Sequence, residues 1–139
     1  MRRPGYGDAV STPDTLRRWH ALVAEPDPDR LTELLAPEVV FRSPAVHAPQ
    51  EGRDRAHAYL WAALAVLGPS LTYVHEWHDE RSAVLRFTAR LDGLDLDGVD
   101  LVTWDAAGRV TEFAVMVRPL RGLQALVTAM GAELGRPAG

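Results

Sequence analysis

The chain has 139 residues, 47% of them hydrophobic and 24% charged, a composition that suits one soluble domain with a core of its own. Its net charge of −4 argues against a nucleic-acid binder, because such a protein needs a basic face that neutralises phosphates. The lack of cysteine excludes disulfides and thiolate metal sites. The sequence shows no signal peptide and no apolar run long enough to span a membrane, so a cytoplasmic protein without membrane attachment is expected.

The first half of the chain carries helix signals separated by prolines. Residues 1–10 are expected to form a flexible N-terminal tail, and residues 11–135 a single domain. Ser11-Thr12-Pro13-Asp14 is typical of a helix start, with a hydroxyl cap, an early proline and an acid near the positive end of the helix dipole. Helical spacing and breaking residues predict a first helix that starts within Ser11–Asp14 and ends at Glu25-Pro26, a short second helix that starts at Asp27-Pro28 and is closed by Pro37, and a third at about 53–67. A short strand is predicted at 39–41 and a loop at 43–52.

From Leu71 onward the apolar period changes to two, which indicates strands. Four strands are predicted, at about 71–79, 82–91, 95–105 and 109–118. The turns between them are short, so neighbouring strands form antiparallel hairpins. A last amphipathic helix follows Pro119 and ends near Gly135. Helices gathered on one face of such a sheet define an α+β domain, and a twisted sheet curling over them leaves a concave interior that suits a ligand.

The stretch from Gly98 to Pro119 carries the most specific local pattern. It consists of an acid at Asp100, a strand, a polar turn that ends in Gly108, and a second strand. This pattern and the order of the elements over residues 14–120 resemble the NTF2-like superfamily, within it the SnoaL-like and ketosteroid isomerase-like proteins. The resemblance implies a cone-shaped fold, in which a curved, mostly antiparallel sheet packs on three N-terminal helices with one C-terminal helix. It also implies a homodimer through the sheet and chemistry without a cofactor.

Comparison with ketosteroid isomerase implies roles for three positions. Its oxyanion-hole aspartate falls on Asp100, its catalytic tyrosine on Trp19, and its general base on Ser43. One of the three functional residue types is kept, and loss of the base argues against steroid isomerisation by the family mechanism. The acid–arginine–acid set of limonene-epoxide hydrolase has no counterpart either, because residues 113–117 contain no acid.

The strand alternation itself makes Asp100 a candidate. Asp100 shares a face with Val102 and Trp104, and the neighbouring strands present apolar faces of their own, made of Leu85, Phe87 and Ala89 and of Phe113, Val115 and Val117. If these faces coincide, Asp100 is a lone carboxyl on an apolar wall, and desolvation raises its pKa so that it can donate a proton or hydrogen bond. The alternatives are a cap on the adjacent hairpin or an ion pair with Arg86 or Arg90.

Histidines offer weaker candidates. His75 shares a strand face with Tyr73 and Trp77, so one reading makes it a base beside Asp100 and the other a solvated strand residue. His75 and His78 lie on opposite faces and have no third ligand at a useful spacing, which argues against a metal. The predicted pocket wall comprises the following residues: Trp19, Ser43, His47, Tyr59, His75, Trp77, Phe87, Val102, Phe113 and Val115.

Three hypotheses about function remain open from the sequence. The first is a cofactor-independent isomerase, cyclase, dehydratase or hydrolase that acts on an apolar polycyclic or terpenoid substrate, with Asp100 as acid or hydrogen-bond donor. The second is a non-catalytic binding module for a small apolar ligand. The third is an interaction protein that dimerises through its sheet. An enzyme requires a second titratable group near Asp100, and a purely structural protein requires a cavity filled by its own aromatic side chains.

Overall fold

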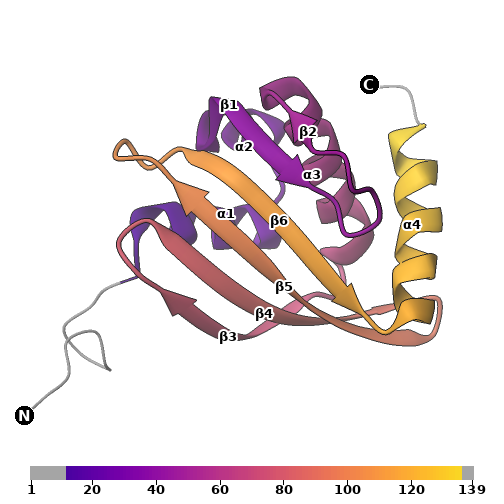
Figure 1. The fold of residues 1–139 in the computed structure, drawn as a ribbon. Helices are drawn as coiled ribbons and strands as arrows, with labels where there is room; N and C mark the ends of the chain where they lie inside the picture. Colours follow the sequence, from indigo (N-terminus) through magenta and orange to yellow (C-terminus); the bar gives the residue numbers. More distant parts are fainter. Residues whose placement is uncertain (1–11, 136–139) are drawn as a thin grey trace, which may run out of the picture.

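Residues 12–135 are described by a computed structural model, and they form four helices and six strands (Figure 1). The helices are α1 (Asp14–Ala24), α2 (Pro28–Leu34), α3 (Arg53–Leu67) and α4 (Leu120–Leu134). The strands are β1 (Leu35–Arg42), β2 (Gln50–Glu51), β3 (Thr72–His78), β4 (Ser82–Leu91), β5 (Leu94–Trp104) and β6 (Val110–Arg118). The predicted α+β class is confirmed.

One sheet contains all six described strands, in the order β2-β1-β6-β5-β4-β3. β1 runs parallel to β6, and every other neighbouring pair is antiparallel. The antiparallel meander from β3 to β6 follows from its short turns, which reverse the chain at once. The parallel pair follows from the long path between β1 and β6, which passes through α3. The sheet is curved and open, and it is mixed but mostly antiparallel, as predicted (Figure 1).

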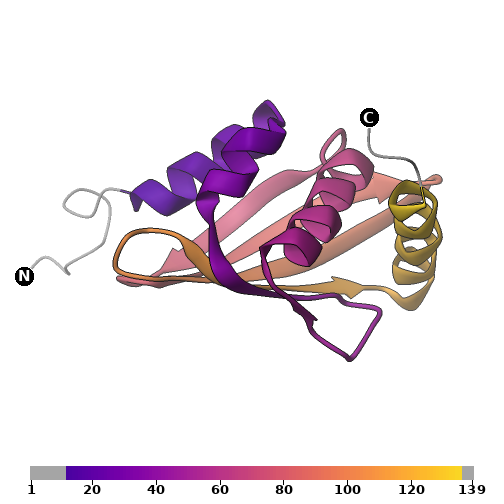
Figure 2. The ribbon, with the colours of Figure 1, turned by 90° about the horizontal axis from the view of Figure 1, so that it is seen from above.

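The helices form a layer over the inner face of the sheet. Figure 2 shows α1, α2 and α3 on one side of the strands, with α4 across one end. α4 packs against α3 and against β4, β5 and β6. None of the helices in residues 12–135 has both the length and the apolar character that a membrane crossing requires.

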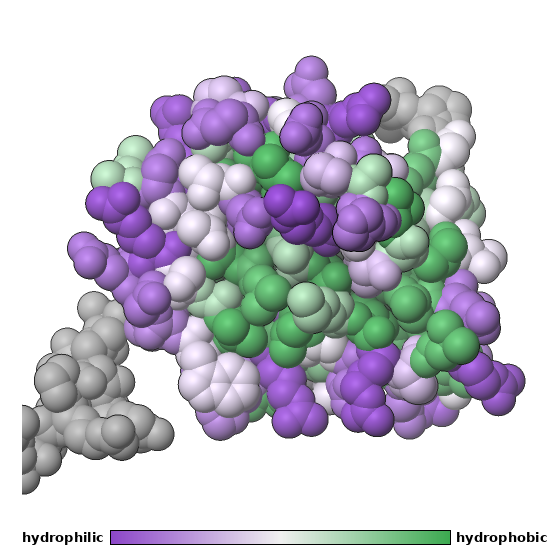
Figure 3. Space-filling view, viewed as in Figure 1, coloured by the Kyte–Doolittle hydropathy of each residue, from purple (hydrophilic) through white to green (hydrophobic). Residues whose placement is uncertain are grey.

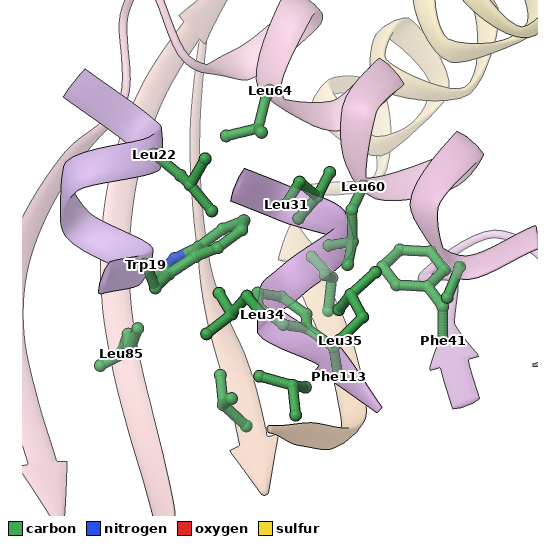
Figure 4. Packing of buried hydrophobic residues seen from close by; sticks show 14 of the residues in the cluster. Trp19, Leu22, Leu31, Leu34, Leu35, Phe41, Leu60, Leu64, Leu85 and Phe113 are labelled. Atoms are coloured by element: carbon green, nitrogen blue, oxygen red, sulfur yellow. The ribbon is translucent and has the colours of Figure 1, made fainter. Parts of the chain in front are cut away.

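The core lies between this layer and the sheet. Side chains from α1, α2, α3, β1 and β6 meet there, among them Trp19, Leu22, Leu34, Leu60 and Phe113 (Figure 4). Each such side chain contributes about 1.5–3 kcal/mol when it leaves water. Burial of this apolar surface holds the helices on the sheet, and the size of the buried side chains sets the distance between the two layers.

Three local details differ from the sequence-based expectation. The first helix is capped by Pro13 without a side-chain hydrogen bond, and Ser11 and the predicted tail at 1–10 lie outside the described residues. β1 starts at Leu35, directly after α2, rather than at 39. The predicted loop at 43–52 contains β2, which pairs with Val40 and Phe41. A two-residue strand leaves no periodicity to detect, because its pairing partner alone defines it.

Candidate functional site

A cavity of about 210 Å³ lies between the inner face of the sheet, α1, α3, α4 and the loop that follows β1. Its walls are mostly aliphatic and aromatic side chains. Among the described residues that line it, the carboxyl and hydroxyl groups come from Asp100, Ser43, Tyr59 and Tyr73, and none is basic. A concave apolar site with a few polar groups is the usual form of a small-molecule site. Since the cavity is not filled by the aromatic side chains around it, the geometry argues against a purely structural protein.

Strand pairing places Asp100 in the middle of the inner wall. Asp100 pairs with Leu85 of β4 on one side and Val115 of β6 on the other. The predicted coincidence of the three strand faces is therefore confirmed. Only 4% of Asp100 is exposed, and its neighbours on the wall are apolar. Water cannot solvate this carboxyl as it solvates one on the surface.

A chain of hydrogen bonds leads to Asp100 from the helix layer. Trp19 Nε1 on α1 donates to Tyr73 Oη at 2.8 Å, and Tyr73 Oη donates to Asp100 Oδ2 at 2.5 Å. Every fully buried side-chain nitrogen or oxygen of the described residues has a hydrogen-bond partner. Asp100 Oδ1 has none among those residues, so it reaches the cavity space and is the oxygen left for a ligand.

Burial dominates the electrostatics of this pair. Loss of solvation raises the pKa of Asp100 to about 7, against the lowering effect of the hydrogen bond from Tyr73. Burial, the charge of Asp100 and the hydrogen bond to it raise the pKa of Tyr73 well above its usual value. Asp100 thus changes protonation near neutral pH, whereas Tyr73 keeps its proton and acts as a donor. Tyr73 is a second titratable group beside Asp100 and cannot serve as its base.

The ion-pair alternative for Asp100 does not hold. Arg90 pairs with Asp95 at 3.0 Å, and Arg86 lies 4.0 Å from Asp97, all four on the outer face of the sheet. Alternation puts these arginines on the opposite side of β4 from Leu85, which pairs with Asp100. The side chain that hydrogen-bonds to Asp100, within residues 12–135, is Tyr73.

A bulge in β3 decides which of its side chains face the cavity. Tyr73 pairs with Phe87 and His75 with Arg86, so Val74 is the extra residue. Beyond the bulge the alternation is reversed. His75 and Trp77 stack on each other at 4.2 Å on the outer face, instead of lining the pocket as predicted. His75 is therefore not a base beside Asp100, and Tyr73 alone of the three lies inside.

The bulge also places Glu76 on the inner side, opposite Leu85. Glu76 Oε1 forms a close contact with His20 Nε2 of α1. The ring of His20 meets that of Tyr73 edge-on, with 5.1 Å between centroids. This half-buried pair flanks Tyr73, outside the described cavity lining.

The other predicted wall residues fall into three groups. Trp19, Ser43, Tyr59, Phe113 and Val115 line the cavity. Phe87 and Val102 are buried in the core beside it, and His47 is exposed in the loop between β1 and β2. The residues of α4 that line the cavity were not predicted. The sequence shows their apolar stripe but not which end of the sheet the helix crosses.

Ser43 occupies the position where the resemblance placed a general base. It lines the cavity, and its Oγ accepts a hydrogen bond from Ala45 N at 3.1 Å. A serine hydroxyl does not ionise at neutral pH, and the described lining has no second carboxyl and no imidazole. The described residues also contain no cluster of three acids or histidines that could hold a metal.

The curved open sheet and its layer of helices have the NTF2-like fold. A model of the SnoaL-like domain family matches residues 16–113, more than half of the chain, and the chain belongs to that family. A search of curated proteins found no match.

Solved structures agree with this assignment. The chain is similar to a protein described as a steroid delta-isomerase from Pseudomonas aeruginosa, with 41% identity over 86% of this chain and 88% of that one, at a TM-score of 0.81. An uncharacterised protein with a cystatin-like fold from Silicibacter pomeroyi shares 31% identity over 86% and 84% of the two chains, at a TM-score of 0.79. A protein with a ketosteroid isomerase-like fold from Catenulispora acidiphila, 15% identical over 87% and 95% of the chains with a TM-score of 0.61, supports the fold alone.

Proposed function

We propose that this protein binds a small apolar molecule that carries a carbonyl or similar oxygen, and that neutral Asp100 donates a hydrogen bond from Oδ1 to that oxygen. One observation carries the proposal: a buried carboxyl has one oxygen occupied by Tyr73 and the other open to an apolar cavity. A pKa of about 7 leaves the neutral form well populated at neutral pH.

The hydrogen-bond chain suits this role. Trp19 donates to Tyr73, Tyr73 donates to Asp100, and neutral Asp100 donates to the ligand, so each bond polarises the next. A ligand oxygen that gains negative charge during a reaction is stabilised by this donor more strongly than the ground-state oxygen is. Preorganised donors of this kind supply catalysis without a cofactor.

The reactions that fit are acid-assisted: isomerisation or cyclisation of the bound molecule, dehydration with release of water, or hydrolysis with uptake of water. The Pseudomonas aeruginosa protein, described as a steroid delta-isomerase, supports isomerisation among these. Apart from Asp100 itself, no carboxylate or imidazole of the described lining could take a proton from carbon in this chain. A reaction here would rely on Asp100 as the acid and on the substrate or water for the other proton transfer.

A second candidate function is binding without catalysis. Two residues favour it. Ser43 cannot act as a base, and the ring nitrogen of Trp19 donates its hydrogen bond to Tyr73 and is not available to a ligand. The two candidates share the pocket and the donor, and they differ in turnover alone.

Binding of acetophenone, a neutral one-ring ketone, tests the shared part. Its affinity, measured by calorimetry, should fall as pH rises through about 7, approaching tenfold per pH unit as Asp100 loses its proton. Asp100→Asn keeps a donor and should bind with no such pH dependence, and Asp100→Leu should lose most of the affinity. Affinity that does not change with pH in the unsubstituted protein, or that rises with pH, would contradict the proposal.

Turnover separates the enzyme from the binder. A small β,γ-unsaturated cyclic ketone should convert to its conjugated isomer, which the change in ultraviolet absorbance reports. The rate should follow the titration of Asp100 and vanish in Asp100→Leu. Binding without conversion would leave the non-catalytic module as the function.

The outer face of the sheet supports a second copy of this chain as a partner. Trp77, Val84, Leu101 and Ala114 form a row across β3, β4, β5 and β6. Figure 3 shows apolar surface gathered in the middle of this face with polar groups around it. Half of Trp77 is exposed (51%), which is unusual for such a large side chain away from an interface.

A homodimer through this face is therefore proposed, and sedimentation tests it. The protein should sediment as a dimer, and Trp77→Asp should sediment as a monomer with an unchanged circular dichroism spectrum. A monomer at micromolar concentration in the unsubstituted protein would contradict the proposal.

A further inference from the structure

The cavity is small compared with the ligands that its fold class suggests. Its volume is about 210 Å³. An engineered apolar cavity of about 150 Å³ in another protein binds benzene. By that measure the space accepts one ring with substituents or two small fused rings, and the four fused rings of a steroid exceed it.

The walls around this space are held by packing on both sides. Leu60 and Leu64 of α3 and Leu126 of α4 are almost wholly buried where they line it. Trp19 is fixed by its hydrogen bond to Tyr73 and by its ring contact with Phe113, with 4.8 Å between centroids. Moving these side chains outward would break core contacts, so the deep part of the cavity does not expand without loss of stability.

The mouth of the cavity lies between the loop after β1 and α4. Val46 on the loop and Val127 and Leu134 on the helix line the cavity and are also exposed to solvent. Figure 1 shows this loop beside α4. Asp100 lies inside and is almost wholly buried, so a ligand places its oxygen inside and its apolar end toward this rim.

The charge of the lining selects against negatively charged ligands. No lysine or arginine is present among the described lining residues, so nothing there would pair with a carboxylate or phosphate. A ligand anion would also lie near Asp100, which raises its cost further. The lining therefore disfavours an anionic ligand, and a neutral ketone suits the donor role proposed for Asp100.

We propose that the pocket selects neutral ketones of one or two rings and rejects four-ring ketones, with the limit set by α4 and α3 rather than by the polar groups. This inference rests on the proposed function, because it takes the oxygen of the ligand to lie at Asp100. If it holds, this chain does not bind ligands as large as a steroid, although it is 41% identical over the compared region to a protein described as a steroid delta-isomerase.

Binding of β-tetralone, a two-ring ketone, and of progesterone, a four-ring ketone, tests the limit by calorimetry at about pH 6, where neutral Asp100 predominates. β-Tetralone should bind at least tenfold more tightly than progesterone. Met130→Ala, which shortens a side chain of α4 that lines the cavity, should narrow that difference by admitting the larger ketone. Leu120→Ala is the matched control, since Leu120 lies on the same helix but is exposed and outside the cavity lining.

The outcomes distinguish the two proposals. Progesterone binding as tightly as β-tetralone, with affinity that still depends on Asp100, overturns the size limit and leaves the proposed function intact. A failure of both ketones to bind overturns the proposed function and this inference with it. An equal gain from Met130→Ala and Leu120→Ala shows that α4 does not set the limit, and that result also overturns the inference.

Discussion

Asp97 and Asp100 lie three residues apart on β5 and differ in almost every physical respect. Asp97 is on the outer face, where 28% of its side chain is exposed and Arg118 and Arg86 lie 3.4 and 4.0 Å away. Asp100 is on the inner face, almost wholly buried, and takes its hydrogen bond from the uncharged Tyr73. An odd spacing on a strand separates the two faces of the sheet.

The difference shows that partner and solvent, rather than residue type, decide what an aspartate can do. The outer acid is surrounded by water and lies beside two arginines. Burial without a cation makes the inner acid a group that holds a proton near neutral pH. The predictions that follow test this contrast between the two faces, in order of expected size.

The largest effect concerns stability and pH. The folded-state pKa of Asp100, about 7, lies above its unfolded value of about 3.9, so the folded protein binds the extra proton between them. This proton stabilises the folded protein by about 4 kcal/mol. The stabilisation is fully present below the unfolded pKa and is lost as pH rises to the folded pKa. Asp100→Asn should lack this fall when unfolding by urea is measured from pH 4 to pH 8. Parallel curves for the two proteins would contradict the assignment.

A substitution at Gly98 should cost about 3 kcal/mol by overpacking the inner face. A Cβ there would lie 2.2 Å from Met116 O and 2.8 Å from Phe87 Cζ. Gly98→Ala is compared with Val99→Ala, the next residue along the strand and on the outer face. Thermal unfolding should show the larger loss for Gly98→Ala, and equal losses would show that the inner face has room to adjust.

Tyr73→Phe removes the donor to Asp100 and should cost about 2 kcal/mol at pH 8, where Asp100 is charged, and less at pH 5. The pKa of Asp100, followed by carboxyl-carbon NMR, should rise because the hydrogen bond lowers it. Tyr59→Phe is the control, since Tyr59 lines the same cavity whereas the hydrogen bond to Asp100 comes from Tyr73. An unchanged pKa of Asp100 in Tyr73→Phe would show that Tyr73 does not donate a hydrogen bond to Asp100.

The smallest effect belongs to the outer face. Asp97→Asn should cost less than about 1 kcal/mol, because its ion pairs with Arg86 and Arg118 are exposed to water. Any cost should shrink further in high salt, which screens such pairs. Chemical unfolding at two salt concentrations measures it. A loss of stability as large as that caused by Tyr73→Phe would contradict the difference proposed between the two faces of the sheet.

Much of the architecture could be read from the sequence. Helices α1 and α3 and strands β4 to β6 were predicted within a residue or so, because each has a clear period and is bounded by proline, glycine or short polar turns. Alternation also placed Asp100 on the inner apolar face. Tyr73 was placed on a face with His75 and Trp77 but was not singled out, since nothing local marks it as the partner of Asp100.

What the sequence by itself determined is the set of elements, the order of the strands in the meander and the position of one acid among apolar residues. These follow from local periodicity, which acts over a few neighbouring residues. The tertiary structure alone decided the bulge at Val74, which places His75 and Trp77 on the outer face, and the position of α4, which forms one wall of the cavity. It also decided the contact of Tyr73 with Asp100. Such features depend on packing between segments far apart in the chain, and no local pattern encodes the distance between them.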